Sequence, residues 1–160
     1  MSDTTFSSRH LLDTRVPAPV IAAVLAAVMH LLPAGEAADA LATVRRVVMD
    51  LSYQLSALVA LAAFLGFLRS RTTINPLRPE RASVLVTDGI YRYTRNPMYL
   101  SLLLLLLGYA CELWNGPAFL APMVYAAYVT RFQILPEERV LAAKFGPDYQ
   151  DYRRRVRRWI

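Results

Sequence analysis

Four long runs of apolar residues dominate the chain, and its polar positions fall mainly between them. The runs are 16–34, 47–68, 98–114 and 117–135, and each contains at most one charged residue. A helix of a soluble bundle would carry polar side chains at helical spacing along one face, but the third run, with its core of consecutive leucines, has no such face. Since about 20 apolar helical residues cross a bilayer core, the pattern predicts an all-α integral membrane fold with about four transmembrane helices.

The C-terminal segment that follows the fourth run has a different pattern. Its apolar residues recur at spacings of three or four along much of the segment: Val140, Leu141, Phe145, Tyr149, Tyr152, Val156 and Trp159. Gly146-Pro147 interrupts them as a helix stop followed by a new helix start. Five of the last eight residues are arginine, so the pattern predicts an amphipathic helix lying on a membrane surface that carries anionic headgroups.

One alternative concerns the first run alone. A basic start, an apolar stretch and the small residues Ala38-Asp39-Ala40 also fit a cleavable signal peptide. We interpret the run as a transmembrane helix.

Composition and charge sharpen this picture. Hydrophobic residues make up 56% of the chain, which excludes a disordered protein, and a single cysteine excludes a disulfide scaffold. The net charge of +6 would suit a nucleic-acid binder, but the apolar content does not, so we expect no nucleic-acid partner. Fourteen of the 18 Lys and Arg residues lie in 69–95 and 131–158, two segments separated by a pair of spans. The positive-inside rule therefore predicts that both segments and both termini are cytoplasmic.

Candidate chemistry lies within this basic face. We predict no metal site, because His10 and His30 have no carboxylate at ligand spacing. The hairpin of the third and fourth spans should bring Tyr99 and Glu137 to the same membrane face, beside the helix start at Asn96. Tyrosines and arginines gathered at one membrane face are also typical of the aromatic and arginine belt of membrane proteins. The adjacent carboxylates of Glu137 and Glu138, however, would anchor poorly at a headgroup boundary.

The motifs in this region resemble those of a known family. The segment 85–99 (LVTDGIYRYTRNPMY), followed after a hairpin by Glu137-Glu138 and by FGPDYQDY at 145–152, is similar to the isoprenylcysteine carboxyl methyltransferases and their relatives, the phospholipid methyltransferases. The resemblance implies S-adenosylmethionine as cofactor and a lipid-like or prenylated methyl acceptor, with carboxyl O-methylation of the isoprenylcysteine type favoured. The resemblance covers about the C-terminal half, from Asn75 to the end, and the first two spans carry no such motif. We expect a single membrane domain, 1–160, in which 69–97 and 136–160 form the cytoplasmic cofactor-binding part.

Carried over position by position, the resemblance implies ten cofactor-binding residues. They are Ser83, Val84, Leu85, Val86, Tyr91, Asn96, Pro97, Met98, Tyr99 and Glu137. As hypotheses, Arg131 holds an anionic group of the acceptor and Glu138 serves orientation or proton handling. The chain departs from the carboxyl methyltransferases at Asn96, where they usually have histidine, and at Gln133, where they tend to have arginine.

These departures leave other functions open. The alternatives are a phospholipid N-methyltransferase, a sterol-reductase-like enzyme that uses NADPH, and a non-enzymatic membrane scaffold. We expect an integral membrane protein, located in the cytoplasmic membrane if the source is prokaryotic. The oligomeric state stays open.

Overall fold

The computed structural model describes residues 16–70 and 84–160, and within these ranges every regular element is a helix. The longer helices are α1 (Ala18–His30), α2 (Asp39–Ser70), α3 (Pro97–Leu113), α4 (Leu120–Val129) and α5 (Leu135–Arg155). Short 3₁₀ helices, Gly89–Arg92 and Gly116–Phe119, precede α3 and α4, and a π-helical turn, Thr130–Ile134, joins α4 to α5.

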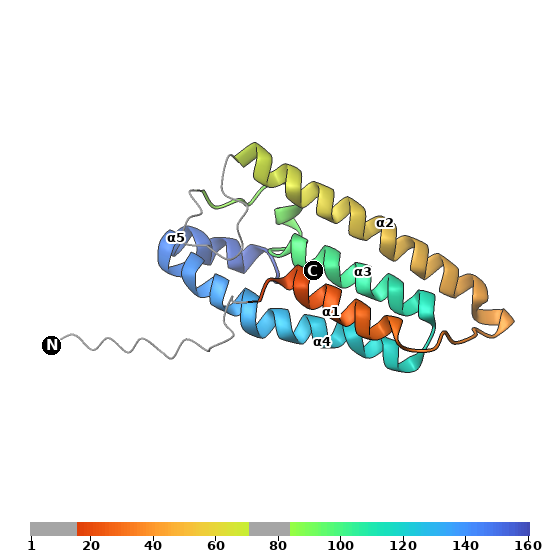
Figure 1. Ribbon diagram of the computed structural model, residues 1–160. Helices are drawn as coiled ribbons and strands as arrows, with labels where there is room; N and C mark the ends of the chain where they lie inside the picture. Colours follow the sequence, from red (N-terminus) through yellow and green to blue (C-terminus); the bar gives the residue numbers. More distant parts are fainter. Residues whose placement is uncertain (1–15, 71–83) are drawn as a thin grey trace.

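Helix α3 is the centre of the bundle. It packs against α1, α2 and α4, and Figure 1 shows it between α2 on one side and the α1–α4 pair on the other. The main core lies among α1, α3 and α4 and includes Met29, Leu106, Tyr125 and Val129. Helix α5 lies at the end of the bundle where α2 finishes and α3 begins (Figure 1), so this end gathers the segments that carry the motifs.

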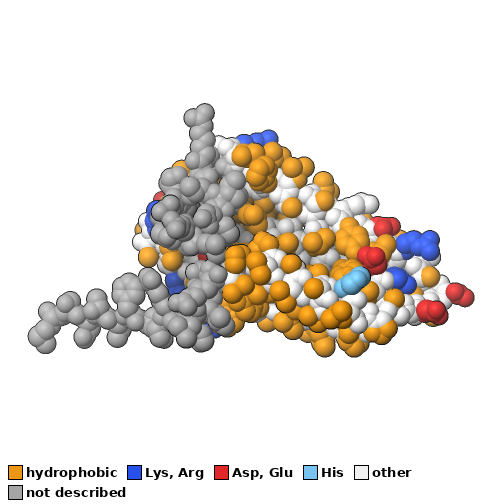
Figure 2. Space-filling view, in the orientation of Figure 1, with side chains coloured by type: hydrophobic (Ala, Val, Ile, Leu, Met, Phe, Trp, Pro, Cys, Tyr) orange, Lys and Arg blue, Asp and Glu red, His pale blue; other side chains and the backbone are white. Residues whose placement is uncertain are grey.

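The outer surface is typical of a membrane protein. Two helical segments, Asp39–Gly66 and Gly116–Arg155, are long and apolar enough to cross a bilayer, and α1 and α3 are shorter apolar helices of 13 and 17 residues. Figure 2 shows hydrophobic side chains covering the middle of the molecule, with acidic and basic groups at one end of this band. The fold is therefore an all-α membrane fold, as the apolar runs predicted.

Helix α2 begins earlier than the sequence pattern indicated. Its first residue is Asp39 instead of Val47, because the helix includes Arg45 and Arg46, which precede the second apolar run. At 1.5 Å per residue its 32 residues extend about 48 Å, more than the bilayer core of about 30 Å. The charged first turns can therefore lie outside the hydrocarbon. Arg45 donates hydrogen bonds to the carbonyls of Cys111 and Glu112, which satisfies the C-terminal end of α3.

The C-terminal segment also differs from expectation. The π-helical turn carries the helix on from α4 into α5 without a break, and the interruption comes at Gly146, as predicted, with φ 50° and ψ −122°. Tyr149, Tyr152 and Val156 do not face a membrane surface. They are buried against Tyr91, because the segment before α3 offers them an apolar partner within the protein. The predicted interfacial position of this apolar face was therefore wrong.

Small side chains let α2 and α3 approach closely. Ser52 and Ser56 on α2 and Ser101 on α3 are buried, and the Ser56 hydroxyl donates a hydrogen bond of 2.7 Å to the carbonyl of Ser101. A Cβ atom at Gly108 would lie 2.8 Å from the ring of Tyr53. Membrane helices rely on such close packing, because lipid tails are as apolar as leucine side chains.

We therefore expect Gly108→Val to destabilise the protein by about 1–3 kcal/mol, the usual effect of overpacking a close contact. Thermal unfolding in detergent measures this change. Gly116→Ala is the matched control, since a Cβ at Gly116 would meet nothing within 4 Å. Equal unfolding midpoints for the two variants would contradict the close α2–α3 contact.

Candidate functional site

The hairpin of α3 and α4 brings together two residues that lie 38 positions apart. Tyr99, buried on the first turn of α3, donates its hydroxyl hydrogen to Oε1 of Glu137 on the first turn of α5. Glu137 itself is half-buried. Pro97 starts α3 at its first helical position, where the missing N–H costs nothing. The predicted convergence of Tyr99 and Glu137 is confirmed.

The π-helical turn sets the position of Glu137. Within it the N–H of Leu135 bonds to the carbonyl of Thr130, five residues back, and Pro136 follows directly without an N–H to donate. Such a turn adds one residue to the helix and changes the angular position of everything after it. On this turn Gln133 is fully buried, and its amide donates to the carbonyl of Val16 before α1. The turn therefore links α1 to the site.

Tyr91 forms the second aromatic side of the site. It is 6% exposed and packs in a cluster with Tyr149, Tyr152 and Val156. The Tyr152 hydroxyl donates a hydrogen bond of 2.8 Å to the carbonyl of Tyr91. Burial raises the pKa of Tyr91, and Tyr152 and the carboxylate of Glu137 raise it further. Tyr91 is thus a neutral phenol held within electrostatic range of Glu137.

The C-terminal residues close this end of the bundle. The chain leaves α5 in an extended conformation at Val156. The N–H of Arg95 then bonds to the carbonyl of Arg157 at 3.1 Å, and the amide of Asn96 donates to the carbonyl of Arg158 at 2.9 Å. Asn96 occupies the N-cap position of α3 as predicted, but its side chain makes no capping bond there. It holds the C-terminus instead.

Glu138 points to a different set of partners from Glu137. Its carboxylate receives both Nε and a terminal nitrogen of Arg158 at 2.9 Å, and Arg95 reaches it at 3.0 Å. The side chains of Arg95 and Glu138 are each only 9% exposed. The hydrogen bond to Glu138 raises the pKa of Arg158. The adjacent carboxylates therefore have different partners. Glu138 connects α5 to Arg158 at the chain end and to Arg95, whereas Glu137 contacts Tyr99.

The other predicted site residues are spread around this centre. Leu85 and Val86 pack against the Tyr91 cluster, whereas Val84 is 51% exposed. Pro97 is buried and Met98 is at the margin of exposure, both beside Tyr99. Ser83 lies outside the described residues. Arg131 is exposed on the π-helical turn, with its guanidinium carbon 5.2 Å from the ring centre of Phe132.

Sequence reasoning missed the structural roles of four residues near the site, although Gln133 was noted as a departure from the carboxyl methyltransferases. Arg158 was counted only as a topology signal and Arg95 also as part of the motif at 85–99, and neither was expected to pair with Glu138. Tyr125 and Gln133 are fully buried, and within the described ranges the Tyr125 hydroxyl and the Gln133 Oε1 have no hydrogen-bond partner. Tyr125 interacts electrostatically with Tyr99. Buried polar atoms are usually satisfied, so these two atoms are exceptions among the described residues. Polar side chains inside an apolar run were the signal that could have revealed them.

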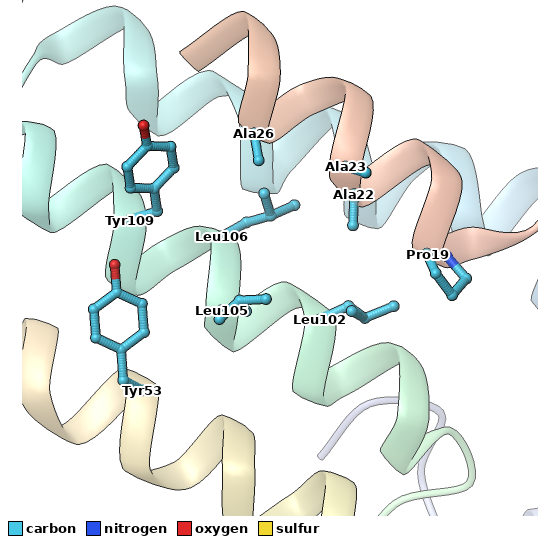
Figure 3. A pocket seen from close by; sticks show the side chains of 9 residues that line it. All are labelled: Pro19, Ala22, Ala23, Ala26, Tyr53, Leu102, Leu105, Leu106 and Tyr109. Carbon is cyan, nitrogen blue, oxygen red and sulfur yellow. The ribbon is translucent and has the colours of Figure 1, made fainter. Parts of the chain in front are cut away.

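A groove leads away from this centre along α3. It has a volume of about 290 Å³ and lies between α1 and α2 with α3 as its floor, as Figure 3 shows. Its lining is almost entirely apolar: Pro19, Ala22, Ala23, Ala26, Tyr53, Leu102, Leu105, Leu106 and Tyr109. Leu102 lies one helical turn from Tyr99, so the groove approaches the Tyr99–Glu137 pair.

Several curated methyltransferases are similar to parts of this chain. A protein-S-isoprenylcysteine O-methyltransferase of Schizosaccharomyces pombe is 36% identical over 76 residues, which cover 46% of this chain and 31% of that protein. A methanethiol S-methyltransferase 2 of Bradyrhizobium diazoefficiens is 39% identical over 74 residues, covering 44% and 26%. A protein-S-isoprenylcysteine O-methyltransferase B of Arabidopsis thaliana is 34% identical over 91 residues, covering 55% and 45%.

These alignments span less than half the length of the three named relatives. No solved structure matches the chain. The sequence model of the phospholipid methyltransferase family, in contrast, matches residues 47–148. That range runs from α2 through α5 and includes Tyr91, Tyr99 and Glu137. Because it covers well over half of the sequence, the chain belongs to the phospholipid methyltransferase family.

Proposed function

We propose that this protein is an S-adenosylmethionine-dependent methyltransferase that acts at the membrane–cytosol interface on a lipid-like or prenylated acceptor. The observation that carries the proposal is the Tyr99–Glu137 pair beside Tyr91, built by motifs of a methyltransferase family. Carboxyl O-methylation of the isoprenylcysteine type is favoured, because two of the named relatives are protein-S-isoprenylcysteine O-methyltransferases.

The residues of the site fit the cofactor. When bound, S-adenosylmethionine supplies an electrophilic methyl group on a positively charged sulfur. Glu137 accepts its hydrogen bond from the neutral hydroxyl of Tyr99, whereas Glu138 is paired with two guanidinium groups. Burial raises the pKa of Glu137 to about 8, and a sulfonium bound beside it would favour the ionised carboxylate. The faces of Tyr91 and Tyr99 also favour a cation. Ser83 to Val86 and Asn96 to Met98 would line the remainder.

The protein's contribution to the reaction is positioning. Methyl transfer from a sulfonium needs neither a metal nor a covalent intermediate, and it gains most when both reactants are held in near-attack geometry. Glu137 would orient the cationic centre, and the hydroxyl of Tyr99 holds the Glu137 carboxyl group in place. The buried aromatic cluster around Tyr91 would help to exclude water from a cofactor bound beside it. Arg131 would hold an anionic group of the acceptor, and Glu138 would act on orientation through the chain end.

The membrane arrangement belongs to the same proposal. Helices α1, α2 and α3, together with α4 and its π-helical turn, form four spans of a single membrane domain with both termini in the cytoplasm. The arginine-rich segments on the α5 side support this orientation. Helices α1 and α3 are short for a bilayer of about 30 Å, and local thinning or extended helix ends accommodate such a mismatch.

Calorimetry on detergent-purified protein tests the cofactor. We expect S-adenosylmethionine and its demethylated product to bind, NADPH not to displace them, and the double variant Tyr99→Phe/Glu137→Gln to lose binding. Displacement by NADPH would favour a sterol-reductase-like enzyme, and absence of binding by either cofactor would favour a membrane scaffold. Mass spectrometry of membrane extracts incubated with methyl-labelled cofactor then separates a carboxylate, a phospholipid amine or a thiol as acceptor.

A further inference from the structure

The groove between α1 and α2 has an open side and a closed end. Its α1 side is lined by the small side chains of Ala22, Ala23 and Ala26, which leave space between the helices, and leucines of α3 form its floor. In Figure 3 the rings of Tyr53 and Tyr109 stand together at one end, while Pro19 and Leu102 lie toward the other. The end at Pro19 and Leu102 is the one that approaches Tyr99.

The surroundings of the groove indicate what occupies it. Val20 and Val24 on α1 and Leu51 and Leu55 on α2 are 47–54% exposed, so the outer faces of both helices carry apolar side chains suited to lipid. A polar molecule in a space with this lining would lose its hydrogen bonds to water without replacement. A hydrocarbon chain entering from the bilayer would instead exchange one apolar environment for another.

The closed end is held in place by polar contacts. The Tyr53 hydroxyl donates a hydrogen bond of 2.6 Å to Oε2 of Glu112, and the Tyr109 hydroxyl shares one of 2.9 Å with Nδ1 of His30. The absence of a side chain at Gly108 lets the Tyr53 ring lie close against α3. Both rings are therefore fixed by partners on other helices, and they form a wall that resists displacement by a chain end.

The length of the groove can be put in terms of carbon atoms. Tyr99 and Tyr109 are ten residues apart on α3, which corresponds to about 15 Å of helix. An extended chain advances about 1.2 Å per bond, since one residue of three backbone bonds spans about 3.3–3.6 Å. About 12 carbon atoms therefore reach from the level of Tyr99 to the tyrosine rings.

We propose that Tyr53 and Tyr109 form an end wall that sets the chain length of the acceptor, whose hydrocarbon tail lies in the α1–α2 groove. The inference rests on the proposed function only for the presence of a lipophilic acceptor. Chains of about 12 carbons fill the groove and place their polar end beside Tyr99. Longer chains leave methylenes outside or displace the polar end, and shorter ones leave part of the groove unfilled.

Photolabelling in phosphatidylcholine nanodiscs tests the wall. The probes are N-acetyl-S-alkylcysteines with chains of 8, 12, 16 and 20 carbons and a diazirine at the chain end. With wild-type protein we expect the 12-carbon probe to label peptides that contain Tyr53 or Tyr109. The 20-carbon probe should label them at least about tenfold more weakly, because forcing its extra methylenes in front of the tyrosine rings would overpack the groove. Tyr53→Ala/Tyr109→Ala should move the optimum to 16 carbons or more.

Two further variants keep the test decisive if the double alanine variant does not fold. Ala26→Phe narrows the groove near its closed end and should move the optimum toward 8 carbons. Tyr93→Ala, at a tyrosine that is 74% exposed, is the matched control and should leave the optimum at 12. An unchanged optimum in folded Ala26→Phe or double alanine protein would overturn the inference.

The result is separable from the outcome for the proposed function. Labelling needs no methyl transfer, and calorimetry with S-adenosylmethionine is run on the same preparations. Cofactor binding without groove labelling would overturn the end wall and leave the methyltransferase proposal standing. Groove labelling without cofactor binding would support the end wall and overturn the methyltransferase proposal. Equal labelling by a phosphatidylcholine that carries the same diazirine would assign the groove to bilayer lipid and overturn the inference.

Discussion

Glu137→Ala is expected to weaken S-adenosylmethionine binding by about 10- to 150-fold and to lower methyl transfer at least as much. The reason is that a hydrogen-bonded, partly buried charge contributes about 1.5–3 kcal/mol, and the loss of Glu137 removes the negative charge that faces the sulfonium. Calorimetry measures the affinity, and transfer of a labelled methyl group to membrane lipid measures the activity.

Two variants divide this effect into charge and orientation. Glu137→Gln keeps the shape and removes the charge, so it should resemble Glu137→Ala. Tyr99→Phe keeps the charge and removes the hydrogen bond to it, so we expect only about a five- to tenfold loss of affinity. Glu36→Gln, at an exposed carboxylate before α2, is the control that should change nothing. Wild-type affinity for S-adenosylmethionine in both Glu137 variants would contradict the assignment of Glu137 to the cofactor site.

The contact between Tyr99 and Glu137 could be foreseen because it depends on connectivity more than on detail. A short turn between two apolar runs forces an antiparallel hairpin, and the residues just outside its open end must then be neighbours. The turn itself comes at Asn115 and Gly116, directly after Trp114, which adopts a left-handed conformation with φ 47°. A motif at each end of a hairpin therefore predicts a site without any knowledge of side-chain packing.

The position of the chain end could not be foreseen in the same way. Helical spacing continues in the sequence up to Trp159, but the helix ends at Arg155 and Val156 is extended. The reversal depends on hydrogen bonds from Arg95 and Asn96 to the carbonyls of Arg157 and Arg158. Such contacts join positions more than 60 residues apart and leave no periodic signal. Arginines also satisfy the positive-inside rule, which concealed their second role.

The groove was equally absent from the sequence pattern. In the sequence, Ala22, Ala23 and Ala26 are ordinary small residues of an apolar helix. They line a groove only because α1 and α2 lie apart from each other on α3. Tyr53 and Tyr109 look like isolated polar interruptions of two different runs. Their meaning comes from Glu112 and His30, which hold the hydroxyl groups. A site shared among three helices requires the three-dimensional arrangement.

Glu138→Ala is expected to destabilise the fold by about 3–5 kcal/mol, the usual cost of removing one partner from a buried ion pair. Arg95 is 9% exposed and would keep its charge without a carboxylate, while Arg158, at 31%, could turn toward water. The measurement is thermal or denaturant unfolding in detergent. The double variant Arg95→Met/Glu138→Leu should recover most of the loss, because replacing a buried pair with apolar groups of similar volume is often neutral.

Affinity for the cofactor separates this structural role from a chemical one. Because Glu138 acts through the chain end, folded Glu138→Ala protein held well below its unfolding temperature should bind S-adenosylmethionine within about threefold of wild type, the scatter expected for a contact outside the ligand. Glu137→Ala should show the opposite pattern, with weak binding and near-normal unfolding. A Glu138→Ala protein as stable as wild type but unable to transfer methyl groups would place Glu138 in the chemistry and would refute its assignment to the chain end. For the two adjacent carboxylates we thus predict opposite results in the binding and unfolding measurements.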